Sequence, residues 1–210
     1  MKEMLSKLSR SRPIFHSEAD FQHALAWEIH KHWQNCSIRL EFKPPYLNNR
    51  IYLDIWATQE DTIIAIELKY KTRRLHVNVE EETFNLLDQS AQDIGRYDFM
   101  KDIQRLEQIV FDRNDIVGYA IFLTNDSAYW STPRDSQTVD ASFRIHQGRS
   151  LTGELSWGSR ASEGTMRGRE EKLHIRGIYK LNWQDYSKIS PESYGMFRSL
   201  LVKIDSGYSE

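Results

Sequence analysis

The sequence predicts an α/β protein in which helices flank a mixed β-sheet. A segment with helical periodicity begins at Ser17, and three strand-like segments follow within residues 37–71. A long amphipathic stretch then precedes an apolar run at Ile116–Leu123. Because a helix between two apolar strands favours a crossover to a parallel neighbour, we expect the order helix, three strands, helix, strand to form a core over about residues 16–126.

Composition limits the classes of protein that this chain can be. Its 210 residues are 40% hydrophobic and 28% charged, which suits a single globular domain over residues 1–210. The single cysteine, Cys36, excludes an internal disulfide framework and a cysteine zinc cluster, and no apolar run is long enough to span a membrane. We therefore expect a cytoplasmic protein without a membrane partner. The net charge of −2 gives no global attraction for nucleic acid, so such binding would need local basic patches.

The first clear helix carries a candidate functional carboxylate near its beginning. Ser17 and Asp20 resemble a capping box in which Asp replaces Glu. Glu18 lies one turn before Phe21, close to the apolar stripe of the helix. Two interpretations of Glu18 remain open: a charge that favours the helix dipole, or a carboxylate directed at the strands that follow.

Two strands joined by a polar turn form the central feature of the sequence, over Arg50–Lys71. In the first strand we expect Ile51, Leu53, Ile55 and Ala57 to share one face, opposite Tyr52, Asp54 and Trp56. In the second strand Ile64, Ile66, Leu68 and Tyr70 alternate with Ile63, Ala65, Glu67 and Lys69. Since both faces of the second strand begin apolar, it is expected to be central, and Glu67 and Lys69 then lie where desolvation is unfavourable.

The length of the turn decides whether Asp54 joins Glu67 and Lys69. A turn with an even number of residues places Asp54 opposite Glu67, whereas a three-residue loop without a bulge sends it to the other face. With an even turn, two carboxylates and an ammonium group meet, as a Mg²⁺ site with a water-orienting lysine would require. The alternative is an ordinary hairpin in which Lys69 pairs with Glu67 or Asp54 at the sheet edge.

Asp54 followed by Glu67-Leu68-Lys69 at the end of an apolar strand resembles the PD-(D/E)XK nuclease superfamily, although Leu53 stands where the family name has proline. The resemblance implies a restriction-endonuclease-like αβββαβ core and a nuclease that hydrolyses phosphodiester bonds, with DNA as the expected substrate. It implies Asp54, Glu67 and Lys69 as catalytic residues and Mg²⁺, or Mn²⁺ as its substitute, held by Asp54, Glu67 and Glu18. It also allows a homodimer. The alternative function is a non-catalytic module of the same fold that binds nucleic acid or protein.

A long helix is predicted from Glu82 to about Phe111, with Gly95 as a kink or a point of close packing. Its apolar stripe is Phe84, Leu87, Ala91, Ile94, Phe99, Ile103, Leu106 and Val110. The superfamily often places a glutamine on this helix near the reacting phosphate, which makes Gln89 a further catalytic candidate. Other polar residues beside the stripe are weaker candidates: Asp93, Arg96 and Tyr97.

Basic residues follow the proposed site directly. Lys71, Arg73 and Arg74 are either a solvated strand end or contacts to a phosphate backbone, and Arg96 is a further candidate for nucleic-acid binding.

Residues 127–172 form a Gly- and Arg-rich insertion, for which we expect a flexible hairpin. A C-terminal extension over 173–205 contains a strand at Leu173–Trp183 and a closing helix or strand within Pro191–Ile204.

Overall fold

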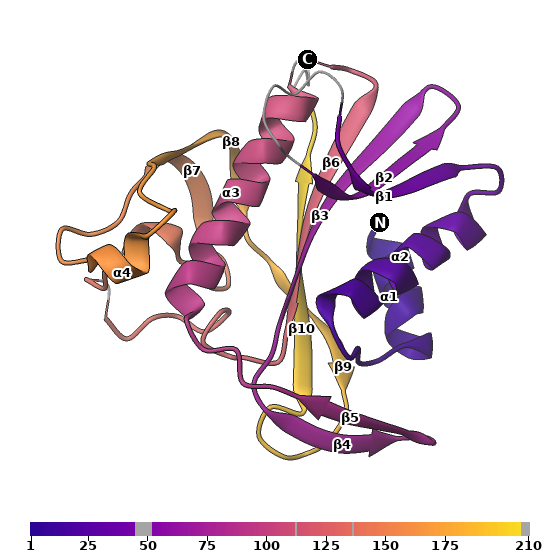
Figure 1. The fold of residues 1–210 in the computed structure, drawn as a ribbon, viewed down its shortest axis with the longest axis horizontal. Helices are drawn as coiled ribbons and strands as arrows, with labels where there is room; N and C mark the ends of the chain where they lie inside the picture. Colours follow the sequence, from indigo (N-terminus) through magenta and orange to yellow (C-terminus); the bar gives the residue numbers. More distant parts are fainter. Residues whose placement is uncertain (45–51, 112, 136, 207–210) are drawn as a thin grey trace.

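The computed structural model describes residues 1–44, 52–111, 113–135 and 137–206. A six-stranded mixed sheet lies at the centre, in the order β1-β2-β3-β6-β10-β9 (Figure 1). Strands β3 and β6 are parallel, and the other neighbours in this sheet are antiparallel. Its strands are β1 Ser37–Phe42, β2 Leu53–Gln59, β3 Thr62–Lys71, β6 Ile116–Thr124, β9 Trp183–Lys188 and β10 Met196–Ile204.

Helices cover both faces of this sheet. Helices α1 (Lys2–Ser11) and α2 (Glu18–His32) lie on one side, and α3 (Gln92–Val110) lies on the other (Figure 1). Each side has its own apolar core, with the sheet between them. Within the described ranges, no helix is both long and apolar enough to cross a membrane.

The expected α/β class, with helices on a mixed central sheet, is confirmed. Ser17 caps α2 by accepting a hydrogen bond from the Asp20 amide at 3.1 Å. Strands β1, β2 and β3 form an antiparallel meander, and α3 connects β3 to its parallel neighbour β6. As predicted, alternate residues of β3 face opposite cores: Ile64, Ile66 and Leu68 pack towards α2, whereas Ala65 packs towards α3.

The helix predicted from Glu82 is wrong in its first third. A hairpin of β4 (Leu75–Val79) and β5 (Glu82–Leu86) precedes α3, which begins only at Gln92. Phe84 and Leu86 are buried against the α2 side of the sheet, but Leu87, part of the predicted helical stripe, is 74% exposed. The apolar residues therefore follow the period of a strand, and Gln89 lies in a loop rather than on a helix.

The alternation predicted for β2 is also wrong at one position. Leu53 packs with Trp56 on the α3 side, whereas Ile55 and Ala57 pack on the α2 side. The pleat is interrupted at Asp54 and at its neighbour in β1, Glu41, whose φ of 48° lies in the left-handed region. The predicted strand residues Arg50 and Ile51 lie outside the described residues.

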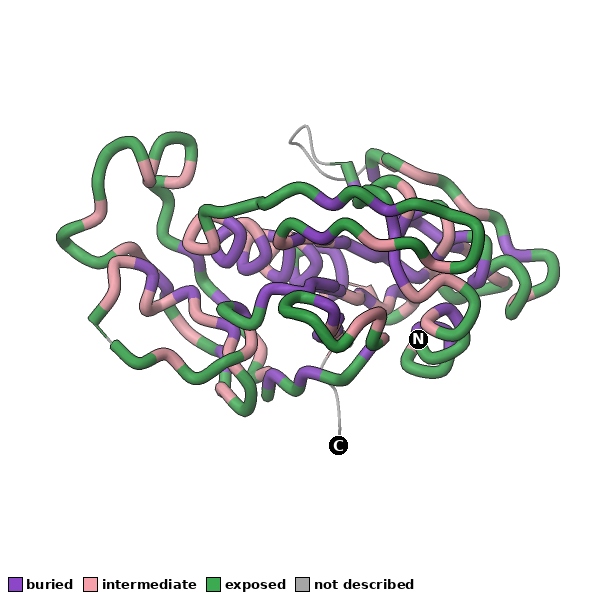
Figure 2. The backbone as a smooth tube through the Cα atoms, turned by 90° about the horizontal axis from the view of Figure 1, so that it is seen from below, coloured by how far each residue is buried: buried purple, intermediate pink, exposed green. Residues whose placement is uncertain are grey.

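The insertion packs on α3 rather than forming an independent hairpin. It contains η1 (Ala141–Phe143), β7 (Ser150–Leu155) and the short helix α4 (Glu163–Met166), and β7 pairs with β8 (Leu173–Lys180). Phe143, Leu151 and Ile175 belong to the core beneath α3. In Figure 2 most residues of α3 are buried, whereas the outer loops of the insertion are exposed. The closing segment is a strand, β10, which pairs with β6 and β9.

Gly95 is a point of close packing in α3, as the sequence suggests. A Cβ atom at this position would lie 2.5 Å from the Tyr129 hydroxyl oxygen and 3.4 Å from the Cζ carbon of the same ring. Tyr129 is 1% exposed, and within the described part of the chain its hydroxyl group has no hydrogen-bond partner. The obstacle to a larger residue is therefore one oxygen atom.

Gly95→Ala should lower the free energy of unfolding by about 1–3 kcal/mol, because the clash outweighs the better helix propensity of alanine. Chemical denaturation measures the change. In the Tyr129→Phe background the clashing oxygen is absent, so the same substitution should become neutral or stabilising. Equal destabilisation in both backgrounds would show that Tyr129 does not limit the space at Gly95.

Candidate functional site at the edge of β3

The candidate site forms where β2 separates from β3. The turn between them consists of Glu60 and Asp61, so the even-numbered turn required by the sequence prediction is present. The pairing of β2 with β3 ends at Ile55 and Ile66. The residues that follow this pair, Asp54 on β2 and Glu67 on β3, therefore lie at the same level. Beyond Ile66, β3 continues alone on this side while its other edge remains paired with β6 as far as Lys71.

Three side-chain oxygens complete the unpaired edge of β3. The Ile63 amide donates to Asp115 on the β6 side, so the amides of even-numbered residues point to the opposite edge. There the Leu68 amide donates to Asp54 Oδ2 at 2.5 Å, the Tyr70 amide to Glu18 Oε2 at 2.6 Å, and the Thr72 amide to Gln89 Oε1 at 2.9 Å. Three of the predicted site residues, Asp54, Glu18 and Gln89, thus lie in a row along one strand edge.

Glu67 and Lys69 project from β3 towards α3, where two charged residues meet them. Arg105 Nη1 lies 2.6 Å from Glu67 Oε1, and Lys69 Nζ lies 2.5 Å from Asp102 Oδ2. Lys69 Nζ also donates to the Leu68 carbonyl oxygen at 3.2 Å. The site therefore combines two carboxylates of the predicted motif with an ion-paired lysine and a backbone carbonyl group.

Burial disfavours ionisation of the acidic groups of this site. Desolvation raises the pKa of Asp54 to about 6, although the Leu68 amide and Lys69 oppose the shift. Desolvation and then the charge of Asp102 raise the pKa of Glu67, against the effect of Arg105. Burial opposes the charge of Lys69, but the Asp102 carboxylate outweighs it and raises the pKa of the lysine. The fold thus disfavours the ionised forms of Asp54 and Glu67, whereas Lys69 is held as a cation.

The oxygen atoms near the site suit a hard divalent cation in type. Asp54 and Glu67 offer carboxylate oxygens, and Leu68 offers the carbonyl between Glu67 and Lys69. Over the ranges that the structure describes, however, no group of three or more His, Cys, Asp or Glu side chains is arranged to hold a metal ion. Glu18 and Asp54 are engaged with amides of β3 and Glu67 with Arg105, so a shared ion would require these carboxylates to exchange partners.

Sequence reasoning missed three residues that support the site. Asp102 and Arg105 are one helical turn apart on α3, beside the apolar stripe, where charged residues are ordinarily solvated. Gln22 of α2 donates to the Asp54 carbonyl at 2.7 Å and to Glu41 Oε1 at 2.8 Å, at the interruption of the pleat. The spacing of three residues places Asp102 and Arg105 on one face of α3, but only the fold shows that this face contacts Glu67 and Lys69.

The weaker candidates on α3 lie away from the site. Arg96 is 4% exposed, pairs with Asp140 and donates to the Ala128 carbonyl at 2.7 Å. Tyr97 is fully buried and donates to the Glu171 carbonyl at 3.0 Å. Asp93 accepts a hydrogen bond from the Ile94 amide at 2.9 Å. Arg96 is therefore a structural ion-pair residue in the interior, and the structure does not bring it to a surface where nucleic acid could bind.

One of the three basic residues at the end of β3, Lys71, lines a cavity. Lys71 lines a hollow of about 260 Å³ together with Glu18, Gln89 and six other residues, namely His16, Ser17, Tyr70, Thr72, Asn85 and Leu87. Arg74 is exposed, whereas Arg73 lies 2.7 Å from Asp88 and stacks over the Tyr194 ring at 5.2 Å. The cavity thus contains Glu18, Gln89 and Lys71, but not Asp54, Glu67 or Lys69.

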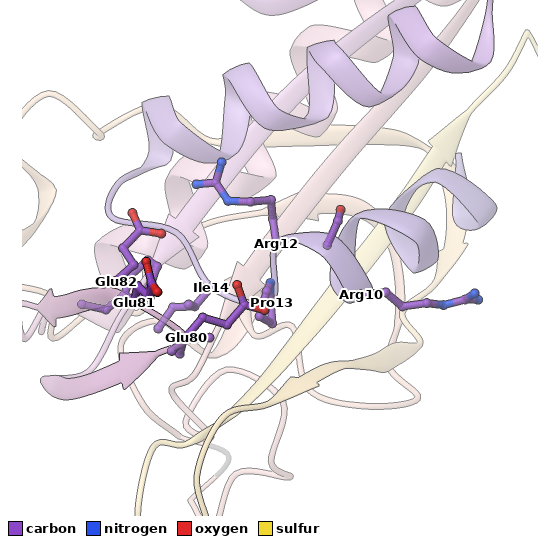
Figure 3. A pocket seen from close by; sticks show the side chains of 10 residues that line it. Arg10, Arg12, Pro13, Ile14, Glu80, Glu81 and Glu82 are labelled. Atoms are coloured by element: carbon purple, nitrogen blue, oxygen red, sulfur yellow. The ribbon is translucent and has the colours of Figure 1, made fainter.

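A second hollow, of about 320 Å³, lies between the α1–α2 connection and the β4–β5 turn (Figure 3). Figure 3 shows Glu80, Glu81 and Glu82 at the hairpin turn, while Arg12 is directed towards α2. Arg12 donates to Asp20 at 2.8 Å, and Glu82 lies 2.8 Å from His16 Nε2. None of the predicted site residues lines this hollow, so we place the candidate site at the edge of β3.

Comparison of the chain with protein families, with curated proteins and with solved structures finds no significant match.

Asp54→Asn should reveal the cost of ionising Asp54 in the fold. Because the folded pKa of about 6 exceeds the ordinary value of 3.8, the wild type gains stability from this group at low pH and loses it as pH rises through 6. The free energy of unfolding of the variant, relative to wild type, should therefore increase by about 1–2 kcal/mol between pH ~4 and pH ~7. Urea denaturation in a metal chelator measures this, and a difference that is independent of pH would contradict the assignment.

Proposed function

We propose that the protein is a divalent-metal-dependent nuclease with a restriction-endonuclease-like core, acting on nucleic acid and most directly on DNA. One observation carries the proposal: Asp54, Glu18 and Gln89, which come from three separate segments, line one edge of β3 beside Glu67 and Lys69. The element order α2-β1-β2-β3-α3-β6 supports the αβββαβ core, with the β4–β5 hairpin added between β3 and α3.

Asp54, Glu67 and the Leu68 carbonyl are the groups that would hold the cation, with Glu18 as an additional ligand. A bound Mg²⁺ would supply a nucleophilic water at neutral pH and positive charge for the developing phosphorane-like transition state. The desolvation of Asp54 and Glu67 is consistent with this role, because a bound cation would stabilise the ionised form of both groups and lower their raised pKa.

Lys69 would act as a hydrogen-bond donor rather than as a base. Asp102 raises its pKa and lies 2.5 Å from Nζ, so the side chain stays charged at neutral pH. A charged lysine beside the carboxylates can orient the attacking water or stabilise charge on the phosphate. Asp102 thus has a positioning role: it fixes Lys69 beside Glu67.

The exposed basic end of β3 supports nucleic acid as the substrate. Lys71 and Arg74 lie one and four residues beyond Tyr70, whose amide donates to Glu18, and Lys71 lines the same cavity as Glu18 and Gln89. Phosphate contacts at this end would align a backbone with the carboxylates. The negative net charge of the whole chain makes such a local patch necessary.

Asp54→Asn and Glu67→Gln should each lower Mg²⁺-dependent cleavage by about a thousandfold or more, because each removes a charge that would bind the cation. Cleavage is measured on single- and double-stranded DNA and RNA, in linear and circular form. Glu154→Gln is the matched control, since Glu154 is an exposed carboxylate paired with Lys172 on the insertion, and it should cleave as wild type does. Cleavage that survives both site substitutions would refute the nuclease assignment.

A second candidate function is a non-catalytic module that binds nucleic acid or protein on the same fold. The observation that favours it is the ion pair of Glu67 with Arg105, which can serve as a purely structural contact between β3 and α3. Such a module would bind its partner without any dependence on Mg²⁺ or Mn²⁺. Loss of nucleic-acid binding on substitution of Lys71 and Arg74, with no cleavage by wild type, would favour this function.

A further inference from the structure

Glu67 and Arg105 form an asymmetric ion pair across the β3–α3 interface. The Glu67 side chain is 3% exposed and sits on a central strand, whereas the Arg105 side chain is 23% exposed. A single guanidinium nitrogen, Nη1, makes the 2.6 Å contact with Glu67 and a longer contact of 3.4 Å with Asp102. The carboxylate is therefore fixed in the interior, and the guanidinium reaches it from the solvent side with one of its nitrogen atoms.

This arrangement differs from that of a pair built for stability alone. Arginine forms its strongest contacts with carboxylates through two parallel hydrogen bonds, as Arg169 does with Asp98 of the same helix, at 2.7 and 2.9 Å. Arg105 has no such fork on Glu67, and Asp102 offers it a second carboxylate. If Arg105 leaves Glu67, it keeps a partner and gains solvent, so its departure does not leave an unpaired buried cation.

A buried carboxylate, by contrast, stays ionised only with a counter-charge beside it. Removing one member of a buried pair is strongly unfavourable, because the remaining charge is desolvated and uncompensated. Glu67 is also close enough to Asp54 and Asp102 to feel their negative charge. Any release of Glu67 by Arg105 must therefore be matched by the arrival of another cation at the same carboxylate.

We propose that Arg105 is the resident counter-ion of Glu67, which it neutralises while no metal is bound and releases when a divalent cation is held by Asp54 and Glu67. The inference rests on the proposed function, since it concerns the same carboxylates. Arg105 thereby competes with the metal, lowers the apparent metal affinity, and keeps the acidic site folded in the absence of metal. Asp102 retains the released guanidinium on α3.

Arg105→Met tests this competition directly through metal binding, without nucleic acid and without any assay of activity. Isothermal titration of the full chain with Mn²⁺ should show affinity about tenfold higher in the variant than in wild type, as expected for loss of a competing interaction. The melting temperature in chelator should fall, and saturating Mn²⁺ should restore more of it in the variant than in wild type. The double variant Arg105→Met/Glu67→Gln should lose the gain in affinity, because the gain arises at Glu67.

Two further variants make the test specific. Arg169→Met removes an arginine of similar exposure that pairs with a carboxylate of the same helix, Asp98, and it should leave the Mn²⁺ affinity unchanged. Arg105→Gln removes the charge but keeps a polar side chain, and it should also bind Mn²⁺ more tightly, which preserves the test if the methionine variant does not fold.

The outcomes separate failure of this inference from failure of the proposed function. Tighter binding in both Arg105 variants supports the inference. If wild type binds Mn²⁺ and the Arg105 variants bind it equally or less tightly, the inference is overturned while the metal site stands. If neither wild type nor the variants bind Mn²⁺, both the inference and the proposed metal site are overturned.

Discussion

The burial of the Glu67 carboxylate between β3 and α3 is the constraint on which the site depends. A charge in this position needs compensation, and α3 supplies it through Arg105, while Asp102 of the same helix takes Lys69. The two ion pairs connect adjacent positions on one face of a strand to one turn of a helix. The central strand and the helix that covers it are therefore held in register by charges as well as by the apolar core around Ile103 and Leu106.

The edge of β3 adds a second constraint. A strand that loses its neighbour exposes amide groups, and buried or half-buried amides require acceptors. Asp54, Glu18 and Gln89 provide those acceptors, one for each successive outward amide. Two of these side chains, Asp54 and Glu18, are also proposed metal ligands, so the stability of the edge and the chemistry of the proposed site depend in part on the same groups. Because these groups have both roles, the stability of each variant must be measured alongside its activity.

Much of this arrangement follows from local sequence signals. The Ser17 cap fixes the beginning of α2 and hence the place of Glu18, and the two-residue turn at Glu60 and Asp61 fixes the register of Asp54 against Glu67. Both signals act over a few residues, which is why they can be recognised without the fold. The apolar run of β6 likewise predicts a buried parallel neighbour for β3, as the structure has it.

The features that could not be predicted depend on contacts between distant segments. The position of Phe84 fits both a helical stripe and a strand. Only the burial of Phe84 and Leu86 together on the α2 side of the sheet distinguishes the strand from the helix. Leu53 changes face beside Asp54, whose carbonyl accepts a hydrogen bond from Gln22, more than thirty residues earlier. Arg105 and Asp102 look like solvated helix residues until α3 is placed against β3, and Arg96 looks like a surface cation until Asp140 covers it.

The most direct test of this account is the location of Mn²⁺ by anomalous scattering in crystals of the wild-type protein. We expect one anomalous peak, from a Mn²⁺ ion bound by Asp54, Glu67 and the Leu68 carbonyl oxygen, with the Arg105 guanidinium moved away from Glu67. Saturating Mn²⁺ with no peak at these oxygens, and with Arg105 still paired to Glu67, would contradict it.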